Sequence, residues 1–186
     1  KLPATFFLVG SMLQRRGGRE LAERAAAEGH WVGNHSMTHT TPLGAGLEPD
    51  EARREIEETQ ALLGDLSHER RFFRPFGGGG IIGQHLLSPA AVDLLCDDAY
   101  TCVLWNSVPR DWEDPRGWVD AALADVDRLE HAVIVLHDLP TGAMDVLPNF
   151  LDVLQAKDTV FVQDFPTDVV AIERGTIRML DGLVAQ

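Results

Sequence analysis

The segment Gly29-His-Trp-Val-Gly-Asn-His-Ser-Met-Thr-His39 holds a short apolar run that gives way to two histidines, His35 and His39. Two histidines four residues apart fall on one face of a helical turn, where both rings can reach one ion. Neutral imidazole is a common zinc ligand, and two imidazoles supply half of a tetrahedral shell. The segment therefore predicts part of a metal site at the end of a strand, with a further ligand supplied from elsewhere.

Apolar runs and helix-forming segments alternate on either side of this segment. We expect buried strands at residues 5–9, 30–33, 100–105, 132–136 and 159–162. We expect helices at residues 19–28, 49–63, 88–97, 115–129 and 143–155. The alternation predicts an α/β fold with a parallel sheet, carried round by right-handed crossovers into a barrel or a partly closed one. One domain is expected over residues 1–186, with a β-hairpin in the tail 168–186 that turns at Arg174-Gly175.

Composition narrows the class of partner. The chain is 45% hydrophobic and 24% charged, with a formal net charge of -13, which argues against nucleic acid or an anionic membrane as a partner. No apolar run approaches the length that crosses a bilayer, so no membrane insertion is expected. The sequence starts at Lys1-Leu2-Pro3 without a methionine or a signal peptide, which we interpret as a chain cut upstream. The sequence therefore does not indicate the cellular compartment of the protein.

Polar residues follow the predicted strands at the end where α/β sites form. They are the histidine pair, Arg74, Asp111 with Trp112, and His137. Each has an ordinary alternative: His137 could cap a strand, Asp111 could cap a loop, and Trp112 could belong to the core. Asn34 and Ser36, beside the first histidine, are candidate turn residues that orient the imidazoles.

Several segments together resemble the polysaccharide deacetylase family, the NodB-homology domain of the metal-dependent carbohydrate esterases. The segment that ends at His39 is similar to the family's metal motif, and Ala4-Thr-Phe-Phe-Leu-Val-Gly10 to its second strand. The remaining matches, in the family's order, are Phe73-Arg-Pro-Phe-Gly77, Arg110-Asp-Trp112 and Val135-Leu-His-Asp138. The resemblance covers roughly residues 4–163 and implies a deformed (β/α) barrel.

The resemblance also implies a role for each residue. His35 and His39 bind a divalent metal, for which zinc is favoured, while cobalt or another divalent ion also fits. His137 is the general acid, and Asp111 is the carboxylate that stabilises its protonated form. Two residues position reacting groups: Arg74 orients the catalytic aspartate, and the Phe76 N–H, beside Gly77, holds the oxyanion. Trp112 and Leu136 line the site under the acetyl methyl group.

One family motif has no match. The family's Thr-Phe-Asp-Asp-Gly motif, which supplies the catalytic base and a metal-binding carboxylate, is not found here, so we expect it upstream of Lys1 together with the first strand and helix. The glycine motif at Phe76 is also one residue shorter than the commoner family form. A sheet without its first strand would expose an edge through which molecules could associate.

These observations favour a hydrolase that removes N-acetyl or O-acetyl groups from an acetylated carbohydrate. Two alternatives stay open. The first is an amidohydrolase of the same superfamily acting on a small cyclic amide or imide, for which the shortened glycine motif leaves room. The second is an inactive fragment or a non-catalytic carbohydrate-binding remnant. Family members are often exported, and a cytoplasmic location is also compatible with the sequence.

Overall fold

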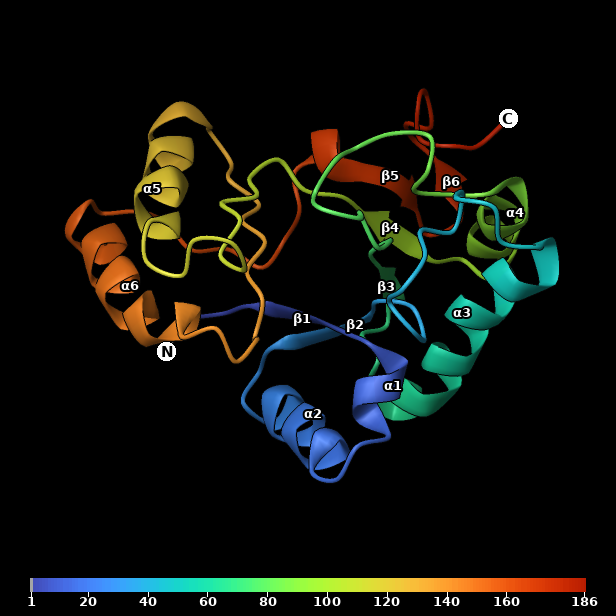
Figure 1. Ribbon diagram of the computed structural model, residues 1–186, viewed down its shortest axis with the longest axis horizontal. Helices are drawn as coiled ribbons and strands as arrows, with labels where there is room; N and C mark the ends of the chain where they lie inside the picture. The colour runs from blue at the N-terminus through green and yellow to red at the C-terminus, as the bar shows by residue number, and fades with distance from the viewer. Residues whose placement is uncertain (1) are drawn as a thin grey trace. The chain divides into compact units, whose positions relative to one another are not determined.

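A six-stranded sheet in the order β1-β2-β3-β4-β5-β6 organises most of the chain in the computed structural model, which describes residues 2–186 (Figure 1). The first four strands run parallel, and the last two pair in antiparallel fashion, so the sheet is mixed. The strands are β1 Thr5–Leu8, β2 Trp31–Asn34, β3 Phe72–Phe73, β4 Thr101–Val103, β5 Val170–Glu173 and β6 Thr176–Ile177. The predicted α/β class is confirmed, and the parallel sheet is extended by an antiparallel hairpin.

The chain forms two compact units. The first contains the described residues up to Leu104 together with Val162–Gln186, and the second is Trp105–Phe161. The first unit holds the whole sheet and the helices α1 Gly10–Leu13, α2 Gly18–Ala27, α3 Pro49–Leu63 and α4 Pro89–Asp97. The second holds α5 Trp118–Arg128 and α6 Leu147–Ala156, which follows the short helix η2 Ala143–Val146. The expectation of one domain over residues 1–186 stays a prediction.

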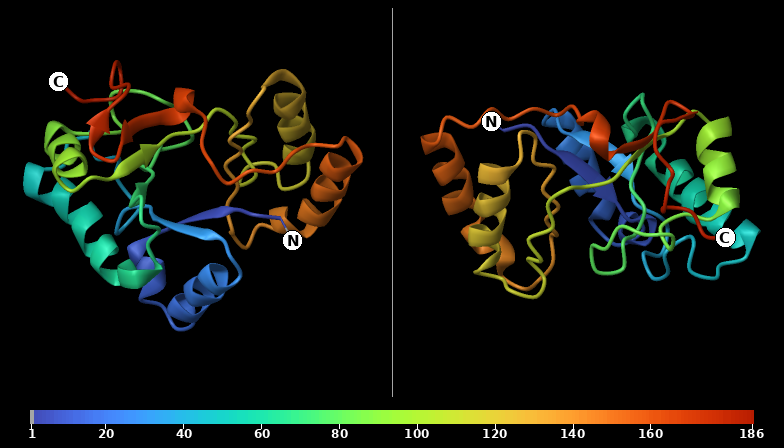
Figure 2. Two further views of the ribbon diagram at one scale, coloured as in Figure 1. Left: turned by 180° about the vertical axis from the view of Figure 1, so that it is seen from behind. Right: turned by 90° about the horizontal axis from the view of Figure 1, so that it is seen from above.

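Helix boundaries in the first unit follow local capping chemistry. Helix α3 begins at Pro49 behind a capping box in which Glu48 and Glu51 exchange side-chain and backbone hydrogen bonds. Helix α4 begins at Pro89 behind Ser88, whose hydroxyl accepts a hydrogen bond from the Ala91 amide. Both helices start and stop where the sequence predicts. Two different views show α1, α2, α3 and α4 following one another along the same side of the strands (Figures 1 and 2).

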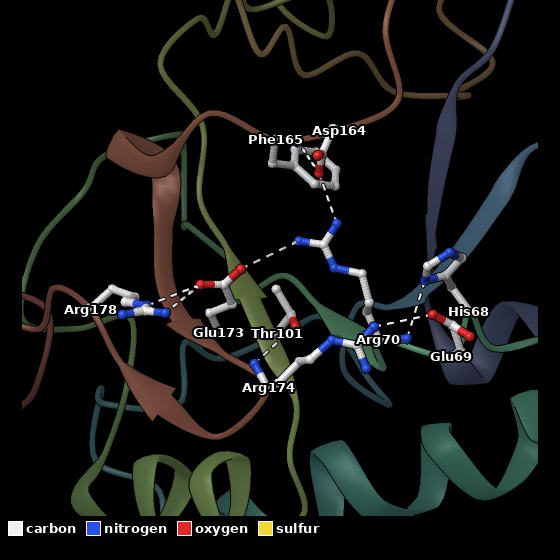
Figure 3. Close-up of polar contacts among 9 residues, drawn as sticks. All are labelled: His68, Glu69, Arg70, Thr101, Asp164, Phe165, Glu173, Arg174 and Arg178. Atoms are coloured by element: carbon white, nitrogen blue, oxygen red, sulfur yellow. Dashed lines mark hydrogen bonds and ion pairs between the residues drawn. The ribbon is translucent and has the colours of Figure 1, made fainter.

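The hairpin of β5 and β6 is confirmed, with its turn at Arg174 and Gly175. Charged side chains connect it to the segment before β3, as Figure 3 shows. Arg70 lies 4.0 Å from Glu173 of β5, and Arg174 contacts Glu69 at 3.1 Å. Arg70 also contacts Asp164, which precedes the hairpin, at 2.8 Å. Strand β5 itself pairs with β4 in antiparallel fashion, at Cys102 and Val103.

An imidazole belongs to the same network. The His68 Nδ1 accepts a hydrogen bond from the Arg70 amide at 3.2 Å, which Figure 3 also draws. Burial against the rings of Trp31 and Phe72 lowers the pKa of His68 below its ordinary value. This histidine is therefore a packed and hydrogen-bonded residue of the first unit.

Two predicted strands are wrong. Residues 132–136 form a single bridge, between Ser107 and Ile134, and their side chains are half-buried against the core of the second unit. They lack a neighbouring strand long enough to build a ladder. Residues 159–162 are not a strand either, because Val160 and Val162 are 81% and 60% exposed.

None of the described helices is long and apolar enough to span a bilayer.

Candidate functional site

Strand β2 ends directly before the histidine pair. The chain turns there through two residues with left-handed backbone, Ser36 at φ 65° and His39 at φ 55°. Asn34 starts this turn, because its Oδ1 accepts a hydrogen bond from the Ser36 amide at 3.0 Å, as a turn residue does. The helical turn predicted for the pair is therefore wrong: residues 35–39 form a loop.

The loop nevertheless brings the two imidazoles together. The Nε2 atoms of His35 and His39 lie 3.1 Å apart, and the ring centroids are separated by 4.6 Å. Two nitrogens bound at about 2.0–2.1 Å to a tetrahedral zinc ion are separated by about 3.3 Å. The pair thus has the spacing of two corners of a zinc shell.

The tautomer of His35 suits metal binding. Its Nδ1 lies 2.7 Å from the carbonyl oxygen of Arg74, and a carbonyl oxygen only accepts hydrogen bonds. The Nδ1 therefore carries the proton and donates it, which leaves the Nε2 lone pair directed to the side of His39. A hydrogen bond of this kind to the far ring nitrogen is typical of metal-binding histidines. Among residues 2–186, no group of three or more His, Cys, Asp or Glu side chains is arranged to hold an ion, so these residues supply a two-donor set.

Arg74 is buried at the end of β3. Its guanidinium donates to the Leu104 carbonyl at 3.0 Å and lies 4.1 Å from the centroid of the Phe7 ring. Burial lowers the pKa of Arg74 to about 9, so the side chain remains a cation at neutral pH. Within the described part of the chain it forms no ion pair with a carboxylate. The structure thus places a desolvated cation one strand away from the histidine pair.

Phe76 and Gly77 follow Arg74 in the glycine motif. The Phe76 ring lies 4.1 Å from the His39 ring, centroid to centroid, and its N–H has no hydrogen-bond acceptor among residues 2–186. The Gly77 carbonyl faces the Nε2 of His85 at 3.1 Å. An N–H without an acceptor in the protein is what an oxyanion donor requires, and the ring of the same residue contacts the histidine pair.

The second unit carries the other candidates. His137 is held twice by the buried Asp111: its amide donates to Oδ2 at 2.8 Å and its Nδ1 lies 2.9 Å from Oδ1. Trp112 packs edge-on against the His137 ring at 4.8 Å. Leu136 packs against the apolar cluster around Trp118. Asp111 and Trp112 therefore hold the imidazole in place, and the bond to Asp111 uses the Nδ1 atom of the ring.

The candidates therefore form two groups. The first unit brings together His35, His39, Arg74, Phe76 and Gly77, and the second brings together Asp111, Trp112, Leu136 and His137.

The sequence did not predict one contact of the loop that carries the two histidines. The side chain of Glu55, on α3, accepts hydrogen bonds from Met37 and Thr38. A glutamate inside a charged amphipathic helix gives no sequence signal for such a role.

Comparison with known proteins agrees with this fold. The sequence profile of the polysaccharide deacetylase family matches residues 1–83. A chitooligosaccharide deacetylase from Sinorhizobium fredii is 32% identical over 142 residues, which are 74% of this chain and 60% of the relative. A peptidoglycan-N-acetylglucosamine deacetylase from Bacillus cereus is 32% identical over 148 residues, 74% of this chain and 61% of the relative.

Solved structures of deacetylases and carbohydrate esterases are also similar to this chain. A peptidoglycan deacetylase from Bacillus subtilis is 30% identical with a TM-score of 0.65, and the match covers 87% of this chain and 73% of the other. A family 4 carbohydrate esterase from Streptomyces lividans, solved with acetate, is 25% identical with a TM-score of 0.70, over 92% of this chain and 84% of the other.

The fold is thus that of the family 4 carbohydrate esterases, an α/β class with a mixed sheet. The chain belongs to the polysaccharide deacetylase family. It spans about 60% of the length of the curated relatives named above.

Proposed function

We propose that this protein is a metal-dependent hydrolase that removes N-acetyl, or less often O-acetyl, groups from a carbohydrate. The observation that supports it most directly is the 3.1 Å separation of the Nε2 atoms of His35 and His39. The two relatives named for chitooligosaccharide and for peptidoglycan N-acetylglucosamine support an acetylated amino sugar as the substrate class.

His35 and His39 would hold the ion. Zinc is favoured by a ligand set of two imidazoles and a carboxylate, and cobalt or another divalent ion also fits it. When bound, such an ion polarises an acyl carbonyl group and makes water more acidic.

The other roles fall to side chains and one amide of this chain. We assign the oxyanion to the Phe76 N–H, beside Gly77, and the orientation of the proton-accepting carboxylate to the buried cation of Arg74. His137 protonates the departing amine from Nε2, while Asp111 fixes the orientation of its ring. Trp112 and Leu136 provide apolar surface for the acetyl methyl group.

Acetate release tests the proposal. The chain together with the upstream segment expected to carry the Thr-Phe-Asp-Asp-Gly motif, loaded with zinc, is expected to release acetate from an acetylated chito-oligosaccharide. His35→Ala is expected to lose this activity because one of the two imidazole donors is gone. A small cyclic imide serves as the competing substrate. Ring opening of the imide without acetate release would replace the proposal by the amidohydrolase alternative, and no reaction with either substrate would favour the non-catalytic one.

A further inference from the structure

The loop between the two histidines is held by hydrogen bonds from one turn of α3. The Glu55 carboxylate accepts from the amides of Met37 and Thr38, each at 2.9 Å, through Oε2. Its second oxygen accepts from the Thr38 hydroxyl at 2.7 Å. Three bonds from one carboxylate thus converge on the two residues midway between His35 and His39.

The neighbouring contacts hold the same loop from other sides. The Asn34 Nδ2 donates to the carbonyl of Ile56, the next residue of α3, at 2.9 Å. The amides of Gly10 and Ser11, at the start of α1, donate to the carbonyls of Ser36 and Met37 at 2.9 and 2.8 Å. Between the histidines, the amides of Met37 and Thr38 and the carbonyls of Ser36 and Met37 are therefore all hydrogen-bonded.

This bonding matters because the loop is strained. Ser36 and His39 both adopt the left-handed conformation, which is unfavourable for residues other than glycine. Such a backbone persists only when surrounding contacts hold it. Bonds to a charged carboxylate are stronger than neutral ones, and Glu55 supplies three of them between the two strained positions.

We propose that Glu55 is a positioning residue for the His35–His39 pair: it sets the separation of the two Nε2 atoms and so the affinity for a divalent ion. This inference rests on the proposed function for the identity of the ligand. Glu55 itself contacts neither ring in the hydrogen bonds described. It acts through Met37 and Thr38, and outer residues of this kind typically change metal affinity by about 10–100-fold.

The test measures the zinc affinity of the full chain by competition with a chelator. Glu55→Ala is expected to weaken zinc binding by about 10–100-fold. Glu55→Gln is expected to stay within a few-fold of the parent, because its side-chain carbonyl accepts from both amides and its amide NH2 donates to the Thr38 hydroxyl oxygen. Glu58→Ala is the matched control, since it removes the same charge from an exposed site on α3. Unchanged affinity in Glu55→Ala, or equal losses in both alanine variants, would overturn the inference.

A second measurement separates this inference from the proposed function. Amide hydrogen exchange at Met37 and Thr38 is expected to accelerate in Glu55→Ala and to stay unchanged in Glu58→Ala. If the parent chain binds no zinc, the proposed function fails, and the positioning role is then decided by exchange together with the ring ¹⁵N signals of His35 and His39. Altered ring signals with faster exchange would support it, and unaltered ones would refute it.

Discussion

At the residue scale, His137 is held by the buried carboxylate of Asp111. Asp111 accepts from both the amide and the Nδ1 of His137, so one carboxylate fixes the position and the ring orientation of the imidazole. This arrangement of acid and orienting carboxylate is what proton transfer from Nε2 needs.

Removal of Asp111 is expected to be costly. Asp111→Ala leaves two donors of His137 without their acceptor, which lowers the free energy of unfolding by about 1–3 kcal/mol. The acetate-release rate is also expected to fall, because the ring is no longer oriented. Denaturant unfolding and kinetics measure the two effects, with Asp138→Ala, an exposed neighbour, as the control. Equal behaviour of the two variants would contradict the assigned role.

Much of the site at this scale could be predicted from sequence order. The histidine pair and Arg74 follow strands β2 and β3, whereas the pairing of Asp111 with His137 was expected from the family resemblance and not from a strand end. Glu55 could not be predicted, because its role depends on a tertiary contact between α3 and a loop 17 residues earlier. The left-handed conformations of Ser36 and His39 were also unpredictable, since neither residue is a glycine.

At the element scale, helices were more predictable than strands. Proline and serine caps define where α3 and α4 begin, and such signals are local. A strand also needs a partner, which the sequence does not display. The apolar residues 132–136 therefore resemble a buried strand but pack half-buried against the helices of the second unit.

The hairpin of β5 and β6 gives a prediction for Gly175. This residue has φ +79°, and an added Cβ would lie 2.4 Å from the Cys96 carbonyl oxygen. Gly175→Ala is expected to lower the free energy of unfolding by about 3 kcal/mol or more, from backbone strain together with this clash. Thermal or denaturant unfolding measures it.

Gly182 provides the control for that experiment. It has φ +74°, but nothing lies within 4 Å of an added Cβ. Gly182→Ala is therefore expected to cost only the left-handed backbone term, about 1 kcal/mol. Equal losses for the two variants would show that the contact with Cys96 does not constrain the hairpin turn.

At the scale of the whole molecule, the α/β class followed from the alternation of segments, while the mixed sheet did not. Strand β1 has one described neighbour, β2, and Phe6 on it is 42% exposed. Association through this edge remains a prediction, as does a single domain over residues 1–186. Both depend on long-range pairing, which a single sequence does not reveal.

The central claim is that His35 and His39 together bind a catalytic divalent ion. Equilibrium dialysis against zinc, followed by metal analysis, tests it on the parent chain and on His35→Ala and His39→Ala. The predicted result is one zinc ion per parent chain and loss of stoichiometric zinc from both variants, with folding verified by circular dichroism. Stoichiometric zinc retained by either folded variant, or none in the parent, would contradict the claim.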